Sequence, residues 1–202
     1  MGSRRLARVS CALVLAAVLA GLGPVVVVRP ESPGPTALSP LVTSATLRPS
    51  SVGNASQWSR FACATNWQCV NETISNGDAT YVYGNATGKS DLYALQDLAP
   101  GGNVTSVTVY AVARAVTAKS CRPNCQASIQ LRILTHGTNY SSSNKVVGTS
   151  YATVSHSWTT NPYTGAAWTV SEVNALQAGE LSSALQTPSV RVTQVYVVVV
   201  LG

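Results

Sequence analysis

The stretch VTSVTVYAVARAV, residues 104–116, decides the fold class of this 202-residue chain. Apolar side chains fall on every second position, so that Val107, Val109, Ala111 and Ala113 share one side and mostly polar or aromatic residues share the other. A period of two is typical of a β-strand with one buried face. We therefore predict a long strand whose valine and alanine side chains face a core.

The same alternation recurs along the chain. Segments 79–84, 91–98, 127–135, 151–159 and 190–200 are rich in β-branched, aromatic or alternating apolar residues, and Gly, Asn, Ser and Pro separate them. Strands at this spacing favour an all-β fold, an antiparallel two-sheet sandwich of the jelly-roll type. In the last segment the apolar residues change from even to odd positions near Thr193–Gln194. Such a shift in the alternation predicts a β-bulge.

One segment interrupts the strands. Thr169 and Glu172 are three residues apart, the spacing of a capping box, and a short apolar stripe overlaps them. Gly179 stands where a glycine commonly ends a helix. We predict one short helix near 169–178 that closes one end of the sandwich, with Trp168 packed beneath it.

Several of these segments together resemble a known family. They are DLYALQDL (91–98), VTSVTVYAVARA (104–115), IQLRIL (129–134), TSYATVSHSWTTNPYTGAAWTVSEVNALQAG (149–179) and VRVTQVYVVV (190–199). They resemble the exported jelly-roll, concanavalin-like domains of archaeal and bacterial surface proteins and of phage structural proteins. The resemblance implies a sandwich that binds glycans or builds surface structures, and it carries no binding residues over to this chain.

The N-terminus predicts export. MGSRRLAR is basic, and the next twenty residues, 9–28, carry no charge, so residues 1–28 have the pattern of a signal peptide or of a membrane anchor. Residues 29–45 contain four prolines and predict an extended linker, which leaves 46–202 as the sandwich domain. The expected location is extracellular or on the cell surface, with membrane contact only through the N-terminal segment.

Cysteines and glycosylation motifs agree with export. An even set of four follows the N-terminal segment, Cys63, Cys69, Cys121 and Cys125, and predicts disulfides in an exported chain. Pairing 63–69 with 121–125 is one of three possible connectivities, and all three remain open. The acceptor motif for N-linked glycans occurs at Asn54, Asn71, Asn85, Asn103 and Asn139.

The positive charge does not indicate nucleic-acid binding. The formal net charge is +6, but three of the arginines, Arg4, Arg5 and Arg8, stand in the first eight residues. The other basic residues are scattered, and no run of Lys or Arg could follow a phosphate backbone. Nucleic acid is therefore not an expected partner.

No catalytic constellation stands out. Glycoside hydrolysis needs two facing carboxylates, and the spacing of the acidic residues predicts no such pair, since Glu172 already serves the helix cap. His136 and His156 accompany no nucleophile motif such as G-x-S-x-G. We expect a protein that is not an enzyme and needs no cofactor.

Two sets of residues are candidates for ligand binding. Calcium prefers oxygen ligands of the kind gathered in one loop at Asn71, Glu72, Asn76 and Asp78, although Asn-Gly-Asp is equally an ordinary turn. Aromatic side chains in loop-like settings could stack on a sugar or could merely cover the edge of the core; they are Trp58, Trp67 and Tyr163, with Tyr83 and Tyr140.

The favoured function is therefore a non-enzymatic, N-glycosylated, exported cell-surface sandwich that serves adhesion, coat or filament structure. Its partners would be surface glycans or further copies of itself. For the latter, the segment LVTSATLRPS (41–50) could donate a strand to a neighbour's sheet edge. The alternative is a carbohydrate-binding module or lectin, and a secreted glycan-active enzyme is the least favoured possibility.

Overall fold

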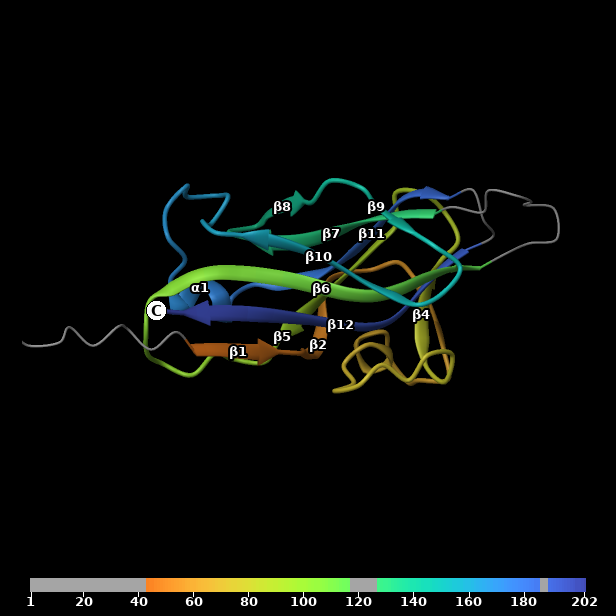
Figure 1. Cartoon of the computed structure of the whole chain (residues 1–202), viewed down its shortest axis with the longest axis horizontal. Coiled ribbons are helices and arrows are strands. Elements are labelled where there is room, and N and C mark those ends of the chain that lie inside the picture. The colour runs from red at the N-terminus through yellow and green to blue at the C-terminus, as the bar shows by residue number, and fades with distance from the viewer. Residues whose placement is uncertain (1–42, 117–126, 186–188) are drawn as a thin grey trace, which may run out of the picture. The chain divides into compact units, whose positions relative to one another are not determined.

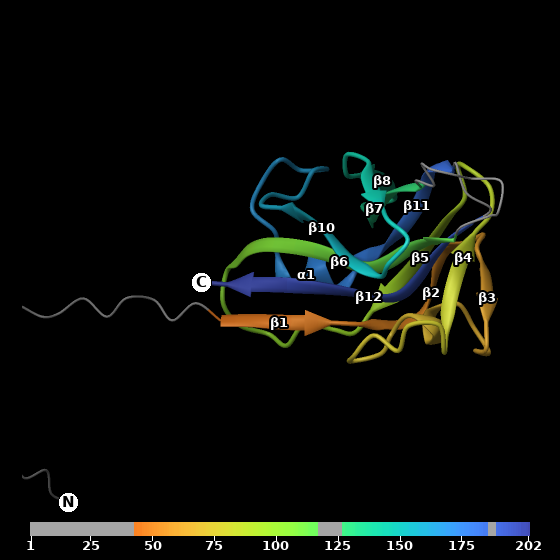
Figure 2. The same cartoon turned by 45° about the vertical axis from the view of Figure 1, so that its right-hand side comes forward.

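The structure is a computed structural model that describes residues 43–116, 127–185 and 189–202 (Figure 1). These residues form two antiparallel sheets, with one 3-10 turn, η1 (Trp67–Cys69), and one α-helix. Figures 1 and 2 show the long strands β6 and β12 running side by side through the middle of one sheet. The predicted all-β sandwich is confirmed.

Each sheet draws strands from distant parts of the sequence. Sheet A has the order β10 (Ala152–Trp158), β6 (Val104–Val116), β12 (Ser189–Leu201), β4 (Tyr81–Gly84), β3 (Ser59–Phe61), and β1 (Thr43–Leu47) also pairs with β12. Sheet B has the order β2 (Pro49–Ser56), β5 (Ser90–Leu95), β11 (Gln177–Leu185), β7 (Ala127–Thr135), β8 (Thr138–Ser141), and β9 (Lys145–Val147) also pairs with β7. Since successive strands repeatedly change sheets, the sandwich is a jelly roll.

The predicted strand faces meet in the core. On β6 all of Val107, Val109, Ala111 and Ala113 are fully buried, and sheet B opposes them with Ile129, Leu131 and Ile133 of β7. Full burial of a valine, leucine or isoleucine side chain is worth about 1.5–3 kcal/mol relative to exposure. These strands therefore supply much of the apolar burial that holds the two sheets together.

β12 is a central strand, as its apolar sequence requires. One side pairs with β6, and the other pairs with β4 and, further along, with β1. The register passes from Val192 opposite Ala113 to Gln194 opposite Val112, which leaves Thr193 as the extra residue of a bulge. The predicted bulge is confirmed, and the strand's apolar end is paired on both sides.

The helix is shorter than predicted. α1 spans Val170–Asn174 and begins with the predicted capping box, in which Thr169 and Glu172 each accept the other's backbone N–H. Gly179 does not end it, because this glycine lies in β11, a strand that the sequence did not predict. Any Cβ at Gly179 would overlap the carbonyl oxygen of Asp91 on β5, so the glycine permits close approach of the two strands. Trp168 is buried, as expected.

Some predicted features lie outside the described residues. They include the signal peptide or anchor at 1–28, most of the proline-rich linker, Cys121 and Cys125. The last residues assigned to the linker, 43–45, lie in β1, so the sheet begins earlier than predicted. In the described part of the chain, no helix has the length and apolar character needed to cross a membrane.

Candidate functional site

A shallow hollow on the outer face of sheet A is lined by aromatic and charged side chains. Its volume is about 260 Å³, and its walls are Phe61, Tyr81, Tyr83, Ser189 and Arg191. The strand register places Phe61 opposite Tyr81 and Tyr83 opposite Arg191. Directly opposed residues on neighbouring strands contact each other, so three strands that are distant in sequence build one surface.

The aromatic rings form a platform and a wall. Phe61 stacks on Tyr81 with ring centroids 4.9 Å apart and planes 15° apart, and Tyr83 is tilted by 59° at 6.0 Å from Tyr81. The guanidinium of Arg191 lies 4.3 Å from the centroid of Tyr81. Tyr81 is covered by these neighbours, whereas Phe61 remains 49% exposed. The structure thus keeps a flat apolar surface in contact with solvent.

Charged groups beside the platform are held in fixed positions by Asp78. Its carboxylate accepts hydrogen bonds from Arg191 at 2.9 Å, from Arg114 at 2.8 Å and from the Tyr151 hydroxyl at 2.8 Å. Burial is the largest single influence on the pKa of Asp78 and raises it, but the hydrogen bonds from Tyr151, Arg191 and Arg114 together outweigh it and bring the pKa below its usual value. Burial and the Asp78 charge raise the pKa of Tyr151 to about 12. At neutral pH the two arginines exceed the one carboxylate by a single positive charge.

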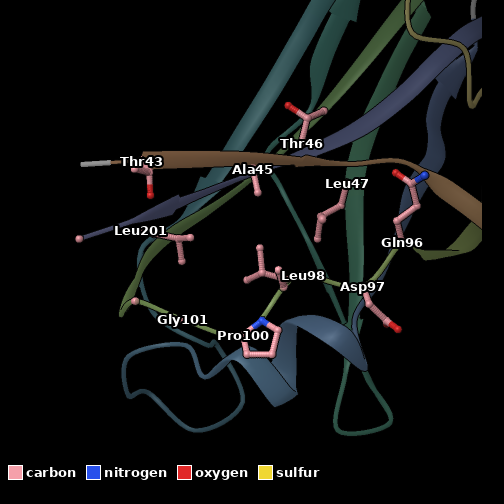
Figure 3. Close-up of a pocket in the computed structure, with 13 residues that line it drawn as sticks. Thr43, Ala45, Thr46, Leu47, Gln96, Asp97, Leu98, Pro100, Gly101 and Leu201 are labelled. Carbon is pink, nitrogen blue, oxygen red and sulfur yellow. The ribbon is translucent and has the colours of Figure 1, made fainter. Parts of the chain in front are cut away.

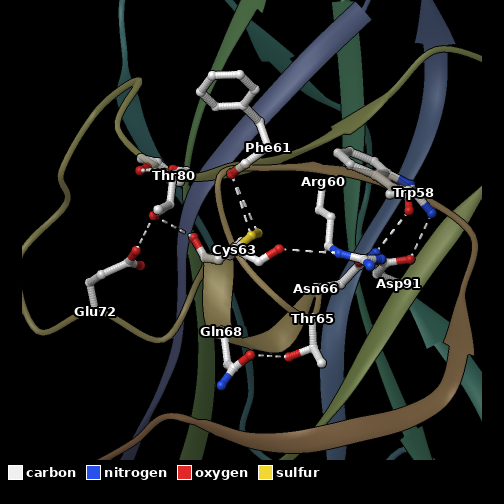
Figure 4. Close-up of a disulfide and its surroundings, with 12 residues drawn as sticks. Trp58, Arg60, Phe61, Cys63, Thr65, Asn66, Gln68, Glu72, Thr80 and Asp91 are labelled. Carbon is white, nitrogen blue, oxygen red and sulfur yellow. Dashed lines mark hydrogen bonds between the residues drawn. A yellow bond between two sulfur atoms is a disulfide. The ribbon is translucent and has the colours of Figure 1, made fainter.

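The segment that carries Phe61 is fastened at both ends (Figure 4). Cys63 and Cys69 form a disulfide, as one of the open connectivities predicted. Immediately after Phe61 the backbone turns at Ala62, which has a φ of +59°, a conformation uncommon for residues other than glycine. At the other end Asp91 accepts backbone N–H groups of Gln57 and Trp58 at 2.6 and 2.9 Å.

Asp91 also belongs to a buried carboxyl pair inside the sandwich. Tyr93 Oη lies 3.2 Å from Asp91 Oδ2 and 2.8 Å from Glu180 Oε1, and both carboxyl side chains are fully buried. A phenol has one hydrogen and can donate to only one of them. Burial, and then the Asp91 charge, raise the pKa of Glu180 well above its usual value. Of the two carboxyls, Glu180 is therefore the one favoured to hold a proton, and a proton on its Oε1 would leave the Tyr93 hydrogen free for Asp91.

We expect Glu180→Gln to stabilise the protein at pH 8 and not at pH 4. The folded-state pKa of Glu180 lies above the unfolded value of about 4.3, so its contribution is full below that pH and is lost as the pH rises. Glutamine offers Tyr93 a donor of the same shape at every pH. The measurement is the Tm, which changes by about 2–4 °C per kcal/mol in a domain of this size. An equal shift at both pH values would contradict the assignment of the proton.

A second exposed aromatic site lies near the helix. Tyr163 is 53% exposed and stacks on His136, with centroids 4.5 Å apart and planes 4° apart. His136 Nε2 lies 3.6 Å from Glu172 Oε1, and Asn161 donates to the same oxygen at 2.9 Å. Tyr163 is thus placed at the surface as predicted, and it does not line the hollow at Phe61.

The other predicted aromatic candidates are less exposed. Trp58 is only 5% exposed, packs against Gly84 and donates its indole N–H to the Lys89 carbonyl, so its prediction as a stacking surface is wrong. Trp67 and Tyr140 are half-buried against the core. Tyr83 does line the hollow. Phe61 and Tyr81 were not predicted as site residues, because only the pairing of β3 with β4 brings them together.

The predicted calcium ligands do not converge. Asn76 donates to Glu72 Oε1 at 3.0 Å and its own oxygen accepts from Thr193, whereas Asp78 is turned toward the two arginines of the hollow. Asn71 is half-buried in the same loop. Burial raises the pKa of Glu72, although its hydrogen bonds oppose this. Within the described ranges, no three His, Cys, Asp or Glu residues form a group suited to a metal ion.

The glycosylation motifs are mostly at the surface of the described domain. Four of the five asparagines are exposed and Asn71 is half-buried; the exposed ones are Asn54, Asn85, Asn103 and Asn139. Asn54 lies in β2 and accepts a hydrogen bond from Gln177 at 3.0 Å, so a strand rather than a loop carries this motif. Their use as acceptors stays a prediction.

Comparison with known proteins assigns this chain to no family. No family model matches the sequence, and no curated protein matches it. Among solved structures, a xylan-binding module CBM15 has 11% identity, a TM-score of 0.40 and coverage of 79% of this chain and 96% of its own. A Cellvibrio japonicus xylanase in complex with xylopentaose has 12% identity, a TM-score of 0.38 and coverage of 74% and 28%. A structure titled "CBM4 structure and function" has 9% identity, a TM-score of 0.33 and coverage of 71% and 89%. Similarities this weak identify no ligand, and of the resemblance expected from the sequence only the jelly-roll fold is confirmed.

Proposed function

We propose that this chain is an exported, non-enzymatic β-sandwich that binds carbohydrate in the hollow around Phe61. The observation that carries the proposal is the exposed aromatic platform of Phe61 on Tyr81, with the hydrogen-bonding groups of Arg191 and Asp78 held beside it. A sugar ring has an apolar C–H face and a rim of hydroxyl groups. The aromatic platform can stack on the C–H face, and the charged groups beside it can form hydrogen bonds with the hydroxyl groups.

The individual side chains have distinct roles in this proposal. Phe61 offers its open face to the sugar ring, and the tilted ring of Tyr83 limits where the sugar can slide. Arg191 supplies N–H donors for hydroxyl or carboxylate oxygens. Because Asp78 already orients Arg191, little side-chain entropy is lost on binding.

The chemistry of the hollow supports binding rather than hydrolysis. Hydrolysis of a glycosidic bond requires a carboxylic acid and a second carboxylate facing the bond. Asp78, a carboxylate beside the hollow, accepts hydrogen bonds from two arginines and a tyrosine that lower its pKa, which opposes a role as general acid. The buried Asp91 and Glu180 have no exposed surface for a substrate to reach.

We expect Phe61→Ala to weaken glycan binding by tenfold or more, about 1.4 kcal/mol, because it removes the stacking surface. The measurement is a glycan array followed by titration calorimetry with the best ligand. Tyr163→Ala is the matched control, since it removes an equally exposed aromatic ring elsewhere on the domain. Absence of binding on a broad array would overturn the proposal, and a larger loss with Tyr163→Ala would move the site to the His136 stack.

Export and N-glycosylation are part of the same proposal. A glycan-binding domain with few charged residues, 10% of the chain, gains solubility from attached sugars. Export also suits the Cys63–Cys69 disulfide, since such bonds persist in oxidising compartments. The intact mass of protein from its native host, before and after enzymatic deglycosylation, tests both points. An unprocessed and unmodified mass would contradict them.

A further inference from the structure

A second cavity, of about 670 Å³, lies beneath strand β1 (Figure 3). Figure 3 shows Ala45 and Leu47 of β1 and Leu201 of β12 pointing into it from one side, with Leu98 and Pro100 facing them from the β5–β6 connection. The apolar side chains that line this space are therefore left without part of the packing that a sandwich core normally provides.

The cavity lies below an open sheet edge. β1 pairs with β12 over five residues, Thr43 to Leu47, and among the described residues no strand pairs with its other side. An unpaired edge presents a row of backbone N–H and C=O groups to any extended segment. A segment added there would gain backbone hydrogen bonds and could place alternate side chains in the cavity.

We propose that this edge and cavity accept residues 35–42 of a second copy, added as a strand beside β1. This segment, PTALSPLV, directly precedes the first described residue, Thr43, which itself lines the cavity. In an extended strand Leu38, Pro40 and Val42 share one side. The segment thus offers an apolar row to a hollow whose walls include Ala45, Leu47 and Leu98, and it belongs to the 42 residues that precede the first described range.

The proline in this segment agrees with an edge position. Proline has no N–H to donate, so in a sheet it is tolerated where that side of the strand faces away from its partner. Backbone groups of alternate residues point to opposite edges. If Pro40 faces outward, Ala37, Ser39 and Leu41 present their N–H and C=O groups to β1. The segment can therefore pair along one side without losing a hydrogen bond at Pro40.

The same sequence disfavours return of the segment onto its own β1. A two-residue hairpin turn requires a positive φ at its first central residue. A turn centred on Pro40–Leu41 would put proline there, which is fixed near −65°. A turn centred on Leu41–Val42 would place side chains there that rarely adopt positive φ, and Val42 is β-branched. Donation to another copy needs no such turn.

The donated segment is long enough to pair along β1. Its eight residues, fully extended, span roughly 26 Å at about 3.3 Å per residue, and β1 has only five residues. A copy that donates its segment to one neighbour and accepts a segment from another makes a head-to-tail contact, which propagates as a filament unless it closes into a ring. The inference goes beyond glycan binding, and assembly would give many linked copies of the hollow.

The test uses the exported chain. We expect the wild-type protein to form multimers, measured by light scattering after gel filtration and seen by negative-stain electron microscopy. Leu38→Asp should reduce it to monomers, because a charge would enter the apolar cavity. Ala37→Asp, the same charge on the opposite side of the same segment, should assemble like wild type. A monomeric wild type, or equal assembly of Leu38→Asp, would overturn the proposal.

The cavity itself provides a second test. Ala45→Trp should fill it and abolish multimers, whereas Ser44→Trp, on an adjacent exposed residue that does not line the cavity, should not. A photo-crosslinker can be placed at residue 38 in a mixture of isotope-labelled and unlabelled protein, so that crosslinks between copies are distinguished from crosslinks within one copy. It should join different copies, at β1 or at the 96–102 connection. Crosslinks within one copy would overturn donation. Phe61→Ala should leave assembly unchanged, which separates this proposal from glycan binding.

Discussion

Asp91→Asn is expected to destabilise the domain by about 2–4 kcal/mol, although the substitution changes only one atom of a fully buried side chain. Asp91 accepts four hydrogen bonds, from Gln57 N, Trp58 N, Asn66 Nδ2 and Tyr93 Oη. An asparagine has one oxygen to accept and an amide that donates. Its amide would face either the backbone donors or the Asn66 amide, and at least one buried donor would lose its acceptor.

Asn66 cannot relieve this conflict by rotating its amide. Its Nδ2 also donates to the Trp58 carbonyl at 2.8 Å, so a flip would exchange one unsatisfied group for another. Burial raises the pKa of Asp91, and its hydrogen bonds lower it, in that order of size. The carboxylate nevertheless has donors on both oxygens, which an amide cannot match.

The measurement is urea unfolding at pH 7, with Tm as a second readout. A loss of 2–4 kcal/mol corresponds to roughly 5–15 °C. Asp97→Asn is the control, because Asp97 is exposed, lies six residues further along the same segment and should change stability little. A small effect of Asp91→Asn, equal to that of the control, would contradict the hydrogen-bond network of Figure 4. Since Asp91 fastens the segment that carries Phe61, glycan affinity should fall as well.

Gly179→Ala is expected to destabilise the domain by about 3–5 kcal/mol and to lower its yield of folded protein sharply. The added methyl group would overlap the Asp91 carbonyl oxygen and lie 2.9 Å from its carbon and 3.1 Å from Leu92 Cα. These are backbone atoms of a paired strand and cannot move aside as a flexible side chain would. The strands β5 and β11 would have to separate in the centre of sheet B.

Gly148→Ala is the matched control, because a Cβ at Gly148 meets no atom within 4 Å and this glycine has no positive φ. It should leave stability unchanged or raise it slightly, since alanine restricts the unfolded chain. The two variants are compared by soluble yield and by thermal unfolding. Equal behaviour would show that β5 and β11 are not as close as the structure places them.

The sequence alone determined the fold class and the details that depend on neighbouring residues. The alternation in β6 and β7, the capping box of Thr169 and Glu172, and the bulge at Thr193 all follow from local rules, and the structure confirms each. A strand's buried face has a period of two, and a helix cap needs only four residues. Such features depend only on residues within one segment, so the sequence of that segment is enough to predict them.

The tertiary structure decided the features that depend on which segments meet. β11 was missed because Gly179 resembles a helix stop until the backbone of Asp91 is placed beside it. Trp58 resembles a loop aromatic until it packs against Gly84, and Phe61 and Tyr81 become a platform only through the pairing of β3 with β4. Tyr93 and Glu180 are 87 residues apart in the sequence, yet they share a buried hydrogen bond, and Asp91 contacts the same Tyr93 hydroxyl. Pairing between distant strands depends on the energy of the whole sandwich, and no local pattern records it.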